Sequence, residues 1–335
     1  MADPLVQLVV GFKEGGMVRC RLLMVLVWLS LSCFLRAYTG SGVDNAIEIT
    51  VVTSCGEYLT TNKYQNSDLF WALRGGGGGT YGVVTSVTYR TYESLPVAYY
   101  YLQANATDAA AMKKLITGFF EFQPNLTDDG WGGYGTMDES GMLFVAVAPD
   151  MSTEAANIST QPLTDYASSL QSEGVSSVVQ ITPIPSWYEW YNLLFDAPGQ
   201  NGENAMMTSR LLSRDTLAYR SEDVSEILVD CHRSFWWVHT YTVTLIVTIL
   251  CSMTAGGKVT QIDPESAGIN PAWRNAVVGA GCVVSWQEGA PSQEIEDEIS
   301  QLKAWMSALY AIAPNDGAYL NEVRTRHVVS RLSVC

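Results

Sequence analysis

Basic residues are scarce in this sequence. Its 335 residues include 19 lysines and arginines against 34 aspartates and glutamates, which gives a formal net charge of −15 at pH 7. The acids are scattered along the chain and form no tail. Nucleic acids and anionic lipids are recognised through clustered basic residues, so this balance argues against either as the main partner. A hydrophobic share of 47% predicts one or two globular domains.

Cysteine pairs closely spaced in sequence are lacking too. The seven cysteines contain no CxxC pair and follow no regular spacing, which argues against a bound zinc ion. Their odd number fits neither a disulfide scaffold nor a redox motif, although it leaves room for one or two bridges. Internal repeats and low-complexity tracts are absent as well.

Long apolar runs are limited to two segments. Arg21–Arg36 has the length and flanking charges of the hydrophobic part of a signal peptide, and initiation at Met17 would improve the match. Phe235–Met253 is long enough to span a bilayer, but its many β-branched residues suit a buried strand at least as well. We expect secretion, with membrane association as the less favoured alternative. Three glycosylation sequons fit secretion, at Asn105, Asn125 and Asn157.

Local patterns predict an α+β chain. Asn45–Asn62 fits two short strands joined by a turn at Ser54–Glu57, and Asn66–Arg74 fits a short helix capped by Asn66 or Ser67. The alternation in Tyr81–Tyr92 predicts another strand. Longer units follow, among them a helix at Ala109–Gln123, a buried strand at Gly141–Pro149 and an aromatic-rich stretch at Pro183–Phe195.

The clearest helix is expected near the end of the chain, over Ser292–Ile312. Ser292 is its expected N-cap, and acidic residues fill its first turns, where they complement the helix dipole. Its apolar face is expected to be a single stripe made of Ile295, Ile299, Leu302, Met306 and Leu309.

Five consecutive glycines, Gly75–Gly79, separate the short helix from the following strand. A phosphate loop of the GxxxxGK[ST] type needs a lysine that is not there, and Gly77, Gly79 and Gly82 match the kinase loop without its other motifs. A dinucleotide fingerprint needs a strand before the loop and a helix after it, which is the reverse of this order. Two interpretations of the glycine run remain: a loop that lets a flat or anionic ligand approach the backbone, and a flexible connector.

The segment around these glycines, NSDLFWALRGGGGGTYGVVTSVTYRTY, closely resembles the end of the FAD-binding domain in FAD-linked oxidoreductases of the berberine bridge enzyme type, particularly their fungal branch. GSGVDNAIEITVVTSCGEYL before it resembles the same domain. Six later motifs resemble that family's substrate domain: GWGGYGTM at Gly130, APDMSTEAANIST at Ala148, SWYEWYNLLF at Ser186, SRLLSRD at Ser209, GGKVTQIDPESAGINPAWRNAVV at Gly256 and APNDGAYLNE at Ala313.

The resemblance implies an α+β fold of two domains. Residues 38–95 would be the C-terminal part of a PCMH-type FAD-binding domain, and residues 96–318 a substrate domain with a mixed or antiparallel sheet flanked by helices. The implied reaction is FAD-dependent oxidation of a small molecule at a C–H or alcohol group, in secondary metabolism or sugar oxidation. Hydride would pass to the flavin, and molecular oxygen would be the acceptor.

The same resemblance assigns site residues. Tyr319 is implied as a proton acceptor, with a packing and hydrogen-bonding role as the alternative. The implied cofactor-binding residues are Asp44, Asn45, Gly77, Gly78, Gly79, Thr80, Gly82, Val83, Val84 and Asn321. Trp187, Tyr188, Trp190 and Tyr191 fit either a substrate pocket or a core, and nothing in the sequence places Glu189 or Asp215 beside the flavin.

The chain also departs from that family's pattern. After Gly15 and Gly16, MVRCRLLMVLVWLSLSCFLRA replaces the loop with the histidine that bonds covalently to the flavin, so residues 1–37 are expected to be aberrant. Residues 319–335 end without the family's aromatic and lysine-rich segment, and His232, His239 and His327 match no family position. These departures suggest retained introns or a frame error in the gene model. The alternative functions are a truncated remnant that cannot hold FAD, and a membrane-anchored or secreted binding protein.

Overall fold

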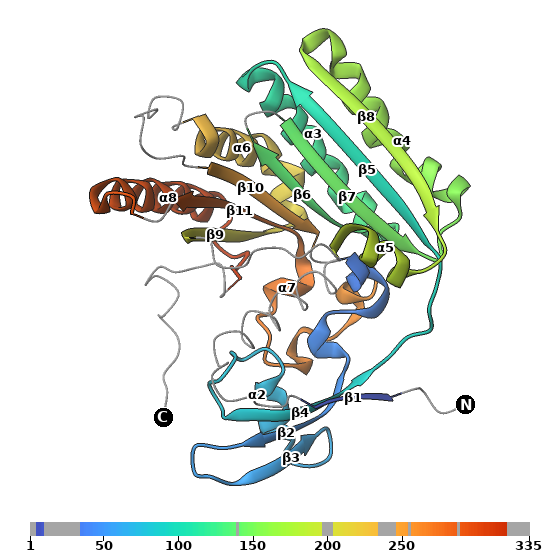
Figure 1. Ribbon diagram of the computed structural model, residues 1–335, viewed down its shortest axis with the longest axis vertical. Coiled ribbons are helices and arrows are strands. Elements are labelled where there is room, and N and C mark those ends of the chain that lie inside the picture. The colour runs from blue at the N-terminus through green and yellow to red at the C-terminus, as the bar shows by residue number, and fades with distance from the viewer. Residues whose placement is uncertain are drawn as a thin grey trace.

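The computed structural model describes residues 5–9, 34–138, 141–195, 204–233, 246–253, 256–286 and 289–319. Two antiparallel sheets organise these residues, a small one with strand order β1-β4-β2-β3 and a large one with order β8-β5-β7-β6-β10-β11-β9 (Figure 1). The predicted α+β class is therefore confirmed.

The strands of the small sheet are β1 Leu5–Val9, β2 Ala46–Val52, β3 Tyr58–Asn62 and β4 Val83–Arg90. Those of the large sheet are β5 Val97–Ala106, β6 Gly132–Asp138, β7 Gly141–Pro149, β8 Val175–Ile184, β9 Asn204–Ser213, β10 Ile246–Met253 and β11 Ala276–Trp286. The helices are α2 Ser67–Leu73, α3 Ala109–Asp128, α4 Thr153–Ser169, α5 Trp187–Phe195, α6 Arg214–Arg233, α7 Ala272–Asn275 and α8 Ser292–Ile312. Short 3-10 turns are η1 Gly42–Asp44, η2 Leu170–Glu173, η3 Val259–Gln261 and η4 Pro264–Ser266.

Most of the predicted elements form where the sequence places them, but α8 differs in two details. The helix starts at Ser292 and Pro291 is its N-cap, so the predicted serine cap is wrong. Its buried face is Glu298, Leu302, Trp305 and Leu309, whereas Ile295, Ile299 and Met306 are only half-buried. Packing against β9, β11 and α6 determines which face of α8 is buried. The apolar stripe in the sequence is too broad to show this by itself.

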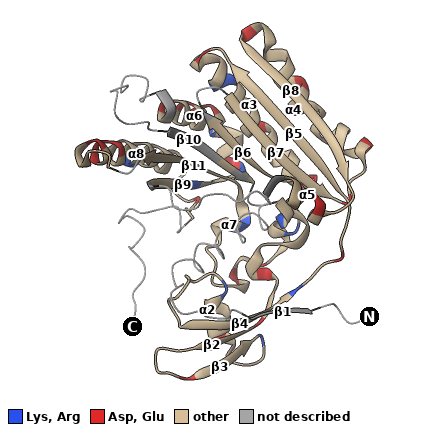
Figure 2. Cartoon of the chain, in the orientation of Figure 1, with Lys and Arg blue, Asp and Glu red and all other residues tan. Residues whose placement is uncertain are grey.

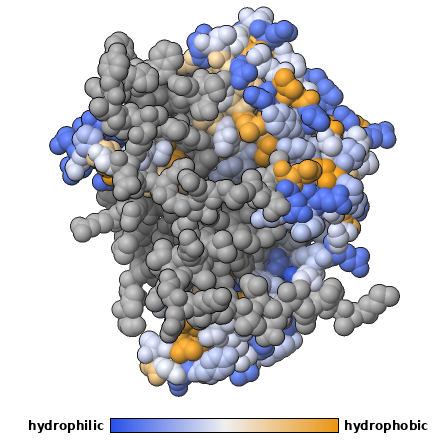
Figure 3. All heavy atoms as spheres, in the orientation of Figure 1, coloured by the Kyte–Doolittle hydropathy of each residue, from blue (hydrophilic) through white to orange (hydrophobic). Residues whose placement is uncertain are grey.

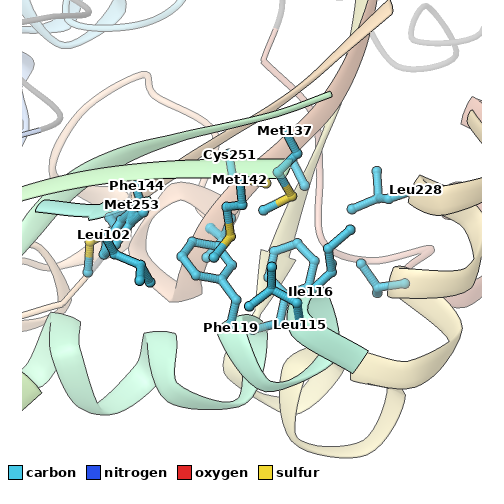
Figure 4. Packing of buried hydrophobic residues seen from close by; sticks show 14 of the residues in the cluster. Leu102, Leu115, Ile116, Phe119, Met137, Met142, Phe144, Leu228, Cys251 and Met253 are labelled. Atoms are coloured by element: carbon cyan, nitrogen blue, oxygen red, sulfur yellow. The ribbon is translucent and has the colours of Figure 1, made fainter. Parts of the chain in front are cut away.

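The main core lies between the large sheet and the layer formed by α3, α4, α6 and α8. Alternate residues of each strand point into it, because successive side chains of a strand lie on opposite faces. Figure 4 shows Leu102, Met137, Met142 and Phe144 of the sheet packed over Phe119 of α3. A disulfide between Cys231 and Cys282 joins α6 of the helix layer to β11 of the large sheet. Figure 2 shows charge mainly on helices and loops, with the strands largely uncharged.

On the opposite face of the large sheet, the described residues form one cluster at the end near β5 and β8 and another at β9, where Leu211 packs with Trp273. In the first cluster, Phe34 and Trp190 pack on Val97, Val147 and Ile184. Phe34 lies in a helical turn formed by residues 34–39, at the end of the first apolar segment, and its side chain is 2% exposed. The described end of that segment is therefore part of the folded core.

The second apolar segment contributes a strand. Ile246–Met253 forms β10 and pairs with β6 on one side and β11 on the other. The strand interpretation of Phe235–Met253 is thus confirmed for these eight residues, and the preceding residues 234–245 lie outside the described parts of the chain. Within those parts, no helix combines the length and apolarity needed to cross a membrane.

Candidate functional site

The five-glycine run connects α2 to β4, and its first two glycines pack against the chain itself. Gly75 has φ +112°, and a Cβ on it would lie 2.6 Å from the Cα of Ile269. A Cβ on Gly76 would lie 2.5 Å from the carbonyl oxygen of Ala72. Real Cβ atoms do not approach other atoms so closely. Close packing of the protein's own atoms, rather than a ligand, therefore requires glycine at these two positions.

The rest of the run faces outward. Gly78, Gly79 and Thr80 are exposed, and a Cβ on Gly78 would meet no heavy atom of the described chain within 4 Å. Gly77 and Gly79 have φ values of +114° and +77°, which favour glycine on backbone grounds. Gly78 has neither a positive φ nor a close described neighbour that would require glycine. This stretch therefore offers a side-chain-free backbone to the outside of the molecule.

The loop then enters the small sheet. Gly82 has φ +149°, and a Cβ there would overlap the carbonyl oxygen of Val52, so Gly82 belongs to the packed part. Val84 packs in the small core beneath the sheet, whereas Val83 is 54% exposed. Of these three predicted cofactor residues, only Val83 presents its side chain outward.

The predicted Asp44 lies in η1, and both of its carboxylate oxygens have protein donors. Arg274 donates from Nη2 to Oδ1 and from Nη1 to Oδ2, each at 2.7 Å. The backbone N–H of Ser41 also donates to Oδ2, at 2.8 Å. Asp44 is thus the anion of a buried ion pair with a residue 230 positions away in sequence.

Asn45 is engaged in the same way. Its Nδ2 donates to the carbonyl oxygens of Thr39 and Ser41 at 3.1 and 3.2 Å, and its Oδ1 accepts from the Tyr92 hydroxyl at 2.7 Å. Both polar side chains of the VDN loop therefore bind other parts of the chain in the region between the two sheets.

Residues 263–276, here called the junction segment, connect the large sheet to the glycine run. The indole N–H of Trp71 donates to the carbonyl oxygen of Glu265 at 2.7 Å, and the N–H of Gly268 donates back to that of Trp71 at 2.9 Å. Arg74 donates to the carbonyl oxygen of Ser266. The helix that leads into the glycines is thus docked on this segment.

Tyr319 meets the junction segment from the other side. Its ring packs edge-to-face on Trp273, with centroids 5.4 Å apart, in a cluster that includes Ile269 and Leu211. The N–H of Leu211 donates to the carbonyl oxygen of Gly317 at 3.2 Å. Because Ile269 also packs on the first glycine of the run, the structure brings these two predicted motifs to one place. Asn321 lies outside the described residues.

Residues before Tyr319 are held on β9. Arg210 is 6% exposed, donates from Nε to the carbonyl oxygen of Ala313 at 2.9 Å, and lies 4.8 Å from the Tyr310 ring centroid. Burial lowers its pKa. Asp316 Oδ2 accepts from the N–H of Ser213 at 2.8 Å and from Thr216 Oγ1 at 2.6 Å. These contacts fix the path of the chain towards Tyr319.

The aromatic stretch in α5 is divided between core and surface. Trp190 is 0% exposed and packs on Phe34 with ring centroids 4.6 Å apart, so its core interpretation holds. Tyr188 is 70% exposed. The ring centroid of Tyr99 of β5 lies 6.1 Å from that of Trp190, and burial raises the pKa of Tyr99 to about 12. The exposed Glu189 joins neither this cluster nor the junction.

Three residues that organise the site were not predicted: Ile269, Trp273 and Arg274. All lie within a motif that the sequence made conspicuous, GGKVTQIDPESAGINPAWRNAVV. Arg274 is 2% exposed, and a buried arginine needs an anionic partner. That requirement signals a carboxylate somewhere, but not which of the 34 acids supplies it.

No protein-family model matches the chain. Curated relatives do. The chain is 32% identical over 305 residues to an uncharacterised FAD-linked oxidoreductase of Arthroderma benhamiae, covering 86% of this chain and 50% of the relative. It is 26% identical over 288 residues to the FAD-linked oxidoreductase patO of Aspergillus clavatus, covering 84% and 48%. The chain spans about half the length of the curated relatives it matches.

Solved structures give the fold. A VAO-type flavoprotein from Myceliophthora thermophila superposes with a TM-score of 0.77 at 22% identity, covering 88% of this chain and 53% of that one. The glucooligosaccharide oxidase of Acremonium strictum superposes with a TM-score of 0.68 at 16% identity, covering 87% and 60%. The chain is therefore related in sequence to FAD-linked oxidoreductases and has the fold of VAO-type flavoproteins. The curated relatives are named as FAD-linked and the superposed structure is a flavoprotein, in agreement with the predicted cofactor.

Proposed function

We propose that the chain binds FAD against the outer half of the glycine run and oxidises a small molecule there. One observation carries this proposal. Gly75, Gly76 and Gly82 are explained by packing within the protein, whereas a Cβ on Gly78 would meet no heavy atom of the described residues within 4 Å. A flat ligand laid against that backbone would be excluded by any side chain at Gly78. FAD bound there would supply the hydride acceptor for a C–H or alcohol group, with oxygen as the final acceptor.

The fit of the predicted residues to FAD differs along the site. Gly77–Thr80 would contact the cofactor through backbone groups, and Val83 through its exposed side chain. Asp44 and Asn45 fit it only through their backbone, since their side chains already have protein partners. Asn321 stays a prediction from the resemblance.

Tyr319 Oη is the group we propose as the proton acceptor. The ring is oriented by Trp273 and reaches the glycine run through Ile269. The substrate would lie on the face of the large sheet that points away from α3 and α4, where Figure 3 shows apolar patches among polar residues. Leu143 and Val178 on that face are 38% and 64% exposed.

The finer assignment is also part of the proposal. It comprises the berberine bridge enzyme type, a PCMH-type FAD-binding part at residues 38–95, a substrate domain at residues 96–318, and a role in secondary metabolism or sugar oxidation. The motifs quoted above support it, and so does the glucooligosaccharide oxidase among the structures of the same fold.

Secretion is proposed on two observations. Asn105, Asn125 and Asn157 are all exposed, and Cys231 and Cys282 form a disulfide, a bond that persists in oxidising compartments. Expression of the full chain in a fungal host followed by glycosidase treatment tests this. A mobility shift supports secretion, and an unshifted intracellular protein contradicts it.

The test of FAD binding is the absorption spectrum of the purified full chain between about 350 and 500 nm, after incubation with FAD and desalting. Retained flavin bands are expected. Gly78→Leu should weaken FAD binding at least ~10-fold with an unchanged melting temperature, because no described residue lies where the new Cβ would be placed. Ala155→Leu, on the exposed side of α4, is the matched control and should leave binding unchanged. A colourless wild type would support the alternative, a remnant that cannot hold FAD.

A further inference from the structure

The ion pair between Asp44 and Arg274 differs from every other ion pair recorded in the described ranges. Its side chains are 6% and 3% exposed, and the geometry is bidentate with both contacts at 2.7 Å. The remaining pairs, such as Arg214 with Asp128, have side-chain exposures between 30% and 78%. Exposed pairs contribute little because water and salt screen them, whereas a buried bidentate pair constrains orientation strongly.

This pair joins two segments that both lead into the proposed site. Asp44 ends η1, directly before β2 of the small sheet. Arg274 lies in α7 within the junction segment, next to Trp273, against which Tyr319 packs. The same segment carries Ile269, which packs on the glycine run. The separation between the glycine run and Tyr319 is therefore set by a segment that Asp44 anchors.

The chemistry of the pair fits orientation better than ligand binding. The carboxylate of Asp44 accepts three hydrogen bonds, from Arg274 and Ser41, which leaves about one of its four acceptor sites for any other donor. Arg274 forms its side-chain hydrogen bonds to Asp44, and its Nε has no partner among the described residues. Removing the Asp44 carboxylate would leave the buried Arg274 guanidinium without the acceptor of its hydrogen bonds.

We propose that Asp44 and Arg274 are positioning residues, which hold the glycine run and Tyr319 in the relative geometry that FAD binding requires. This rests on the proposed function. In this proposal the Asp44 carboxylate acts indirectly, through Arg274, and does not contact the cofactor. The planar guanidinium of arginine is then essential, because lysine cannot form the same two parallel hydrogen bonds.

The test compares Arg274→Lys with Arg214→Lys in the full chain. Both changes keep the charge and remove a guanidinium fork, but only the first affects the buried pair. In the absence of FAD, hydrogen exchange should accelerate together in residues 75–82 and 313–319 of Arg274→Lys, and in neither segment of Arg214→Lys. With FAD, the dissociation constant should rise ~10-fold or more only in Arg274→Lys, with a change in the flavin absorption bands.

The outcomes separate the two claims. If the wild type retains no FAD, the proposed function fails, and the exchange data still decide whether the pair positions both segments. If the wild type binds FAD and Arg274→Lys binds it equally, or if exchange changes only around η1, the positioning role is wrong. Should Arg274→Lys not fold, Asp44→Asn removes the anion from the other side and is expected to show the same joint acceleration.

Discussion

The two sheets of this protein differ sharply in how they are stabilised. The large sheet is backed by four helices and a core that extends from β5 to α8. The cluster described beneath the small sheet contains four buried apolar residues, namely Ala46, Ile49, Phe70 and Val87. Since burial of apolar area is the main driving force of folding, the large region carries its own stability. The small region depends on its contacts with the junction segment, and the glycine run lies on that dependent side.

The difference bears on where the proposed cofactor loop is placed. A loop that must leave its backbone accessible cannot bury its own side chains, so its conformation has to be imposed from outside. Here Ile269 packs on Gly75. The Trp71 indole donates a hydrogen bond to the backbone of Glu265, and the N–H of Gly268 donates one to the backbone of Trp71. The rigid large region thus shapes the loop of the less stable one.

The largest expected effect comes from the two cores. Phe144→Ala in the large core should lower the free energy of unfolding by about 3–5 kcal/mol, because it leaves a cavity among fully buried side chains. Phe70→Ala should leave the main thermal transition in place and instead make residues 46–92 sensitive to protease. Calorimetry with limited proteolysis measures both. Equal losses in the main transition would show that the regions unfold as one.

The next largest effect is expected where the glycine run packs on the junction segment. Gly75→Ala should cost about 2–3 kcal/mol, because a methyl group would meet the backbone of Ile269 at a positive φ. Denaturant unfolding of this variant beside Gly78→Ala gives the comparison. The second change should cost less than about 1 kcal/mol, since its Cβ would meet no described heavy atom within 4 Å. A harmless Gly75→Ala would contradict the packed inner half of the run.

A pH effect is expected within the large region. Burial, with Asp297 and Glu294 nearby, raises the pKa of Glu298 from 4.5 to about 7. The folded state then binds this proton more tightly than the unfolded state, so Glu298 progressively lowers stability as pH rises from about 4.5 to about 7. Glu298→Gln should stabilise the protein by on the order of 1–2 kcal/mol at pH 8. Below pH 4 the difference should vanish, and melting curves across this range test it.

The smallest effect concerns a helix cap on the main core layer. Asp108 Oδ1 accepts from the N–H groups of Ala110 and Ala111 at 2.9 Å and caps α3. Asp108→Ala should cost about 1 kcal/mol in the main transition and leave the small region unaffected. Asp108→Asn, which keeps an accepting oxygen, should restore most of it. Protection of residues 46–92 in hydrogen exchange is the control.

Sequence reasoning succeeded where the determining forces are local. The β2–β3 hairpin, α2 and β4 follow from alternation and turn residues within a few positions. It succeeded in part for α8, whose existence is local but whose buried face depends on neighbours far away in sequence. It did not find the Asp44–Arg274 pair, because 230 residues separate the partners and many acids could have filled the role.

What the sequence determined by itself is the set of local elements, the position of the glycine run and the resemblance that pointed to FAD, since each is written in contiguous residues. Only the tertiary structure decided which glycines are required by packing and which face outward. It also decided that Tyr319 meets the glycine run through Ile269 and Trp273. These are contacts between segments brought together by burial of the large core, and the physical reason is that close packing depends on distances in space that sequence separation does not encode.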